Sequence, residues 1–194
     1  MATGRAHSSS GGGGSPVRMP DLKKVDHLGP LTIPLHGLHA MALSSAEETF
    51  RLKGEHPPTF LVAAGTDVYW IEESWDSNEE RGFKFSLMRV VLAMMGARAY
   101  SFISEVYVAA MTVEEVEKYG QPNELADLPR DRRDEMLWID SWDRQGANYG
   151  STYLITPARP PARQRPFLGP RVEQEYDVMV GRASNLFQPP KDIP

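Results

Sequence analysis

Two histidines and a group of acidic residues have the types and spacing that suit metal chemistry. His36 and His39 are three residues apart, so on a helix they would share one surface and could bind a divalent metal with one carboxylate. They do not form the His-Glu-x-x-His motif of zinc proteases. Oxygen ligands that suit Mg²⁺ or Ca²⁺ follow later in the chain: Glu72, Glu73, Asp76, Glu79 and Glu80. One hypothesis is therefore a metal-dependent hydrolase or nuclease; the alternative is a solvent-facing His pair beside a capped helix start.

Two acidic residues lie within apolar strand sequences. An isolated buried carboxylate is costly, so Glu105 must be paired, protonated or close to solvent. We expect an ion pair with an arginine of the following charged loop, which contains Arg130, Arg132 and Arg133. An exposed strand end and a functional acid are the alternatives. Asp140 is a similar case, because it alternates with two tryptophans and could face water.

Aromatic and basic residues form a candidate interaction surface. Trp138 and Trp142 would share one face of a strand, and tryptophan is over-represented where proteins meet. The stretch 159–171 has four arginines, four prolines and no acid, so it should be extended. The residues of this predicted surface are Trp138, Trp142, Arg159, Arg163, Arg165 and Phe167. The first hypothesis is a non-enzymatic interaction or assembly domain that binds a protein partner or its own copy. The alternatives are tryptophans that pack in the core and an arm that packs on its own domain.

Composition and missing motifs exclude several classes of protein. The chain of 194 residues has no cysteine, which excludes disulfide scaffolds, iron–sulfur clusters and thiol nucleophiles. No Gly-x-Ser-x-Gly motif and no phosphate-binding loop occur. The negative charge is concentrated in residues 31–157, which disfavours binding to double-stranded nucleic acid. No membrane span or secretory signal is evident, so we expect a cytoplasmic protein without a cofactor. A third hypothesis is a small-ligand sensor with a pocket lined by Met88, Met94 and Met95.

The elements that would position these residues predict an α+β fold with a mainly antiparallel sheet of about five strands. A helix over 34–53 starts at Pro34 and ends before Gly54. A second helix over 78–95 starts at a capping box, and we expect Phe83, Leu87, Val90, Val91 and Met94 to face the core. We expect strands at 59–63, 68–73, 99–111, 135–142 and 151–157, a short helix at 112–120, and an edge strand within 172–180. This order, α-β-β-α-β-α-β-β, is profilin-like or roadblock-like by analogy.

Three segments are expected along the chain. Residues 1–30 are rich in glycine and serine and should form a disordered tail. Residues 31–157 should form the α+β domain. Residues 158–194 should form an Arg/Pro-rich arm.

Five short pieces resemble a family of small uncharacterised proteins of bacteria and their phages. They are Pro58-Thr59, Ser104-Glu105-Val106-Tyr107, Pro129-Arg130-Asp131-Arg132-Arg133-Asp134-Glu135, Leu168-Gly169-Pro170 and Ser184-Asn185-Leu186-Phe187. The resemblance rests on the order of these pieces over about 130 residues. It departs at Tyr107, where the family pattern has Trp. The resemblance implies a bacterial or viral origin and implies no mechanism.

Overall fold

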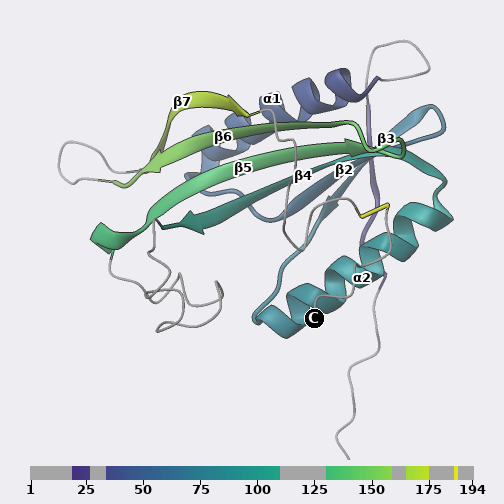
Figure 1. Ribbon diagram of the computed structural model, residues 1–194, viewed down its shortest axis with the longest axis horizontal. Helices are drawn as coiled ribbons and strands as arrows, with labels where there is room; N and C mark the ends of the chain where they lie inside the picture. The colour runs from purple at the N-terminus through teal and green to yellow at the C-terminus, as the bar shows by residue number, and fades with distance from the viewer. Residues whose placement is uncertain (1–18, 27–33, 110–129, 159–164, 175–185, 188–194) are drawn as a thin grey trace, which may run out of the picture.

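A seven-stranded antiparallel sheet forms the centre of the described structure (Figure 1). The computed structural model describes residues 19–26, 34–109, 130–158, 165–174 and 186–187. In chain order the elements are β1 (Lys23–Val25), α1 (Leu35–Lys53), β2 (Thr59–Ala64), β3 (Asp67–Glu72), α2 (Asn78–Met94), β4 (Ala97–Val108), a 3₁₀ turn (Arg130–Arg132), β5 (Asp134–Asp143), β6 (Asn148–Thr156) and β7 (Phe167–Gln174). The strands lie in the spatial order β1-β3-β2-β4-β5-β6-β7. Within the described ranges, no helix has the length and apolar character to cross a membrane.

The predicted α+β class is confirmed, but the strand number and the element order are not. The sheet gains β1, which lies inside the predicted tail and pairs with the edge of β3. A salt bridge of 2.8 Å between Lys24 and Asp67 supports this pairing. The edge strand β7 begins at Phe167, before the predicted range, and pairs with β6. The predicted helix at 112–120 lies outside the described residues.

Helix α1 covers one face of the sheet, and its bounds follow the prediction. Pro34 is its N-cap, and Gly54 closes it with a φ of 79° and an N–H bond of 2.7 Å to the Phe50 carbonyl. Its apolar side chains Leu38, Ala42, Ala46 and Phe50 are buried. These side chains pack on residues of β2, β4, β5 and β6 in one core cluster.

Strand β4 is the central strand of the sheet. It lies between β2 and β5, and its alternate residues enter two different cores. Ile103 packs in the α1 core, whereas Tyr100 and Phe102 pack in the α2 core. The sheet is therefore covered on both faces, with α1 and α2 on opposite sides (Figure 1).

Helix α2 begins at its predicted cap but buries a different face. Ser77 Oγ accepts the N–H of Glu80 at 3.1 Å. The side chains of α2 that are buried in the core are Phe85, Met88, Val91 and Leu92, so of the predicted stripe only Val91 is fully buried. Phe85 sets this orientation, because its ring contacts Phe60 at 5.8 Å and Phe102 at 5.3 Å. Arg81, Lys84 and Arg89 are partly buried on this helix.

Candidate functional site

The outward side of α2 is apolar and open to solvent. We call it the α2 outer face and define it by the exposed helix residues after Glu79, which are Phe83, Ser86, Val90, Ala93 and Met94. The three large side chains are 49%, 53% and 74% exposed at Phe83, Val90 and Met94. None of the five residues is charged. In Figure 1, no described helix or strand lies on the side of α2 that faces away from the sheet. Surface helices normally place charged residues on that side, so this face is unusual.

The residues in the middle of the α2 outer face are small, and the one hydroxyl among them already has a hydrogen-bond partner. Gly82 precedes Ser86 by one turn, and Ser86 Oγ donates to the Gly82 carbonyl at 3.0 Å. The serine hydroxyl is therefore satisfied within its own helix. Another helix could approach closely here, because nothing larger than a serine side chain projects from these two positions.

The two ends of the face carry opposite charges. Asp76 and Glu79 are exposed at the start of α2. At the other end, Arg98 donates to the Gly65 carbonyl at 2.9 Å and Arg144 donates to the Ala97 carbonyl at 2.5 Å. These bonds hold both arginines beside the point where α2 passes into β4. The apolar strip therefore runs from an acidic end to a basic end.

The predicted tryptophan surface is not an open face. Trp138, Asp140 and Trp142 alternate along β5 and share the side of the sheet that carries the α2 core. Trp142 is only 7% exposed, and Trp138 is half-buried. Their shared strand face was predicted correctly, but a side chain as buried as Trp142 cannot meet a partner.

Asp140 is a buried carboxyl with one side-chain hydrogen bond. It is 3% exposed, and its Oδ2 accepts the indole N–H of Trp142 at 2.6 Å. Its Oδ1 has no hydrogen-bond partner. Its cross-strand neighbours are Phe102 and Gly150, neither of which has a polar side-chain atom. Burial raises the pKa of Asp140 to about 7.

Leu186 and Phe187 return the C-terminal region to the α2 layer. Leu186 is buried, and its N–H donates to the hydroxyl of Tyr100 at 2.9 Å. The Phe187 ring lies 5.3 Å from the Tyr100 ring, and the Arg144 guanidinium lies 5.8 Å from the centre of Phe187. Burial also raises the pKa of Tyr100. Sequence reasoning did not give this Leu-Phe pair a structural role.

The arm residues pack on their own domain where the structure describes them. Arg165 Nη1 donates to the Leu52 carbonyl at 2.6 Å and so satisfies the C-terminal end of α1. Phe167 begins the edge strand β7 and is exposed. Arg159 and Arg163 lie outside the described residues. The alternative of an arm packed on its own domain therefore holds at Arg165.

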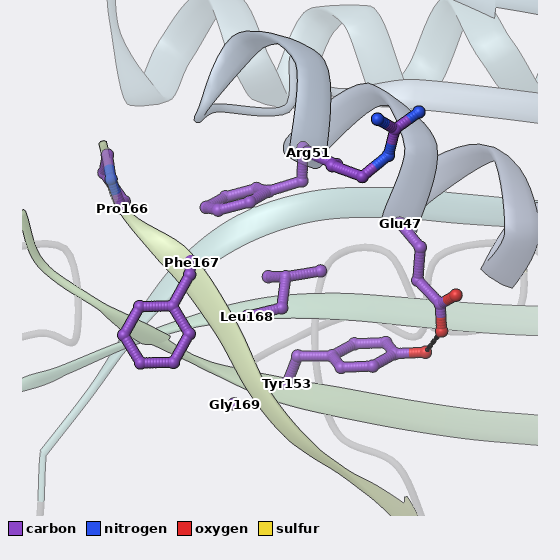
Figure 2. Close-up of a pocket in the computed structure, with 8 residues that line it drawn as sticks. Glu47, Arg51, Tyr153, Pro166, Phe167, Leu168 and Gly169 are labelled. Atoms are coloured by element: carbon purple, nitrogen blue, oxygen red, sulfur yellow. Dashed lines mark hydrogen bonds between the residues drawn. The ribbon is translucent and has the colours of Figure 1, made fainter. Parts of the chain in front are cut away.

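A shallow groove lies between α1 and β7 (Figure 2). Its volume is about 410 Å³, and Phe50, Pro166 and Leu168 supply apolar lining. At one end, the Tyr153 hydroxyl donates to the Glu47 carboxylate, as Figure 2 shows. Burial and this neighbouring carboxylate raise the pKa of Tyr153. The groove lies on the face of the sheet opposite the predicted methionine pocket.

The methionines of that predicted pocket do not surround a common space. Met88 is buried in the α2 core, whereas Met94 is 74% exposed. Met95 is only partly buried and packs against the same core as Met88. The part of α2 that was expected to line a cavity is therefore filled core on one side and open surface on the other.

The predicted metal ligands are not brought together. His36 is exposed, whereas His39 is buried with both ring nitrogens engaged, Nδ1 at 2.8 Å from Ser141 Oγ and Nε2 at 3.0 Å from Ser151 Oγ. The acids near α2 have local partners, since Glu73 pairs with Lys84 at 2.7 Å. Among the residues that the structure describes, no three His, Asp or Glu side chains are placed to hold a metal ion. Glu72 and Asp76 are exposed and do not converge with either histidine.

Among the described side chains, Glu105 does not form the predicted ion pair with Arg132 or Arg133, and the side chain of Arg130 lies outside them. Its Oε1 accepts the backbone N–H of His56 at 2.5 Å, and burial raises its pKa. Arg133 instead lies over the ring of Tyr107, with its guanidinium carbon 4.3 Å from the ring centre. The prediction failed because the acid could be satisfied by a backbone donor after α1, which the sequence does not reveal.

The geometry therefore places one exposed apolar surface on α2 and one groove beside α1. Comparisons of the chain with protein-family models, with curated proteins and with solved structures found no match.

Proposed function

We propose that this chain is a protein-interaction domain that uses the α2 outer face as its contact surface. The observation that carries the proposal is that every exposed residue of α2 after Glu79 is uncharged. The fold itself does not need this pattern, because a Lys or Glu on the solvent side of a surface helix costs little. Apolar side chains at those positions gain free energy only when another surface covers them.

Covering the α2 outer face would contribute a substantial free energy of association. Complete burial of one large apolar side chain contributes about 1.5–3 kcal/mol, and these side chains begin about half exposed. Covering Phe83, Val90 and Met94 would therefore contribute roughly 1 kcal/mol each. The predicted Trp138/Trp142 surface offers less, since Trp142 is already buried.

A non-enzymatic role agrees with the chemistry of the described residues. Among the buried titratable groups, Asp140 is enclosed by the core, Glu73 pairs with Lys84, and His39 bonds to serine hydroxyls. The hydrolase hypothesis would need convergent acids, which the described acids near α2 do not supply. The resemblance to small bacterial and phage proteins supports a bacterial or viral origin for the proposed interaction.

A photo-crosslinking amino acid at Val90 tests the proposal in the native cell. The matched control carries the same amino acid at Ser44, which is exposed in the middle of α1. We expect a discrete covalent adduct from position 90 and none from position 44. The adduct should disappear when Phe83 and Met94 are both replaced by Glu in the same chain. An equal yield from both positions, or no adduct from position 90, would contradict the proposed function.

A further inference from the structure

We infer that the partner covering the α2 outer face is a second copy of this chain, arranged about a two-fold axis with the two α2 helices antiparallel. This inference rests on the proposed function and names its partner. In a two-fold interface, the same patch of each copy meets itself. The patch must therefore be self-complementary in shape and in charge.

The residue at the two-fold axis must tolerate its own copy. Ser86 is midway between Asn78 and Met94 and is exposed, small and uncharged. Helix axes in contact lie about 8–10 Å apart, and small residues at the crossing allow the close end of that range. Gly82 is one turn away, so the helix backbones can approach each other there.

The antiparallel arrangement matches apolar residues across the axis. With Ser86 on the axis, residues equally far from it on either side are opposed. Val90 then lies opposite Gly82 of the second copy, where the missing side chain leaves room for it. Phe83 lies opposite Arg89 of the second copy. Arg89 is partly buried, and its Nε is enclosed within the chain.

Charge favours a second copy in this orientation. The acidic end of the face, at Asp76 and Glu79, meets the basic end of the second copy, at Arg98 and Arg144. A parallel arrangement would instead bring the acids of the two copies together and the arginines together. Opposite charges at the two ends of an apolar strip therefore select antiparallel self-pairing.

The surface area that the two α2 helices can bury limits the stability of the expected dimer. A helix of 17 residues is about 25 Å long and about 10 Å wide. One such face buries a few hundred Å² per copy, which is less than the roughly 800 Å² per partner of a standard stable interface. We therefore expect a dimer that forms reversibly with rising protein concentration.

The absence of cysteine makes this geometry directly testable, because an introduced thiol is the only one in the chain. A disulfide needs Cα atoms about 4.4–6.8 Å apart, which two close helices reach most readily at the axis. We expect Ser86→Cys to form a covalent dimer under mild oxidation. The matched control is Ser44→Cys, the same exchange at the exposed centre of α1, and it should remain monomeric.

A mixed pair of variants tests the direction of the helices. Glu79→Cys and Ala93→Cys are equally far from Ser86, on opposite sides. Mixed together, they should cross-link to each other faster than either does alone. If each variant cross-links faster alone than in the mixture, the helices are parallel and the proposed arrangement is wrong.

The outcomes separate this inference from the proposed function. If Ser86→Cys dimerises no faster than Ser44→Cys, a second copy does not cover the face. In that case a photo-adduct at Val90 with a different protein would preserve the interaction function and overturn only the self-pairing. Light scattering of the unmodified chain over a concentration series gives an independent measure. A mass that stays at that of one chain up to the highest soluble concentration would also overturn the dimer.

Discussion

Asp140 and Trp142 form a closed pair on one face of β5, in which the indole N–H donates to one carboxyl oxygen and the other oxygen has no partner. The carboxyl lies between Phe102 and Gly150 on the neighbouring strands. Burial removes the water around this carboxyl and hydrogen bonding only partly replaces it, so the pKa of Asp140 is raised to about 7. The pair thus links the stability of the α2 layer to protonation.

Asp140 should make the chain less stable as the pH rises toward neutrality. The folded-state pKa of about 7 lies above the ordinary value of 3.8, so the folded state binds the extra proton between these two pH values. The free energy of unfolding should therefore fall by about 2–3 kcal/mol between pH 5 and pH 8 from this group alone. Urea unfolding at both pH values measures it. The control is Asp140→Asn, which keeps an acceptor for Trp142 and should flatten the dependence; an unchanged slope would contradict the assignment.

Tyr100→Phe should release Leu186 and Phe187 from the α2 layer. The substitution removes the hydroxyl that accepts the Leu186 N–H and leaves a buried donor unsatisfied, at a cost of about 1–3 kcal/mol. Hydrogen exchange at Leu186 should accelerate, and proteases should cleave this region sooner. Tyr153→Phe is the matched control, because its hydroxyl bonds to Glu47 on the opposite face of the sheet. Equal exchange at Leu186 in both variants would show that the Tyr100 bond does not hold the segment.

Gly54→Ala and Gly65→Ala should destabilise the chain by similar amounts. Both glycines have positive φ, 79° and 58°, so each alanine carries a backbone cost of about 1–2 kcal/mol. A Cβ at Gly54 would lie 3.4 Å from Pro166 Cδ, which is an ordinary van der Waals contact, and a Cβ at Gly65 meets nothing within 4 Å. Backbone strain is therefore the only cost expected at either position. Thermal unfolding measures both variants, and a clearly larger loss at Gly54 would show that Pro166 does not accommodate the added Cβ.

Local signals predicted the parts of the fold that local chemistry controls. Pro34 and Gly54 delimit α1, and Ser77 caps α2, because these residues act within one helical turn. Strands β1 and β7 were missed or misplaced because they are edge strands that depend on a neighbour for pairing. Lys23–Val25 becomes a strand only through β3, and nothing in its own residues requires it.

The site was harder to predict, because the exposure of a side chain depends on which other elements pack over it. Trp138 and Trp142 do share a strand face, but the sequence could not show that the α2 layer buries Trp142. The apolar residues of α2 occur all around the helix, so periodicity alone could not select the buried side. Contacts of Phe85 with Phe60 and Phe102, which are distant in sequence, decide it.

Two adjacent valines of α2 test this orientation directly. Val90→Glu places a charge on the α2 outer face, where the valine is 53% exposed, so the free energy of unfolding should change by less than about 0.5 kcal/mol. Val91→Glu places the same charge in the core, where the valine is 2% exposed, and the chain should unfold or lose more than about 4 kcal/mol. Chemical unfolding at low protein concentration measures both without a contribution from association. If α2 faced the core as its sequence first indicated, the two substitutions would be equally damaging. A tolerated Val90→Glu beside a disruptive Val91→Glu would show that the apolar outer side is not needed for the fold, as the proposed contact surface requires.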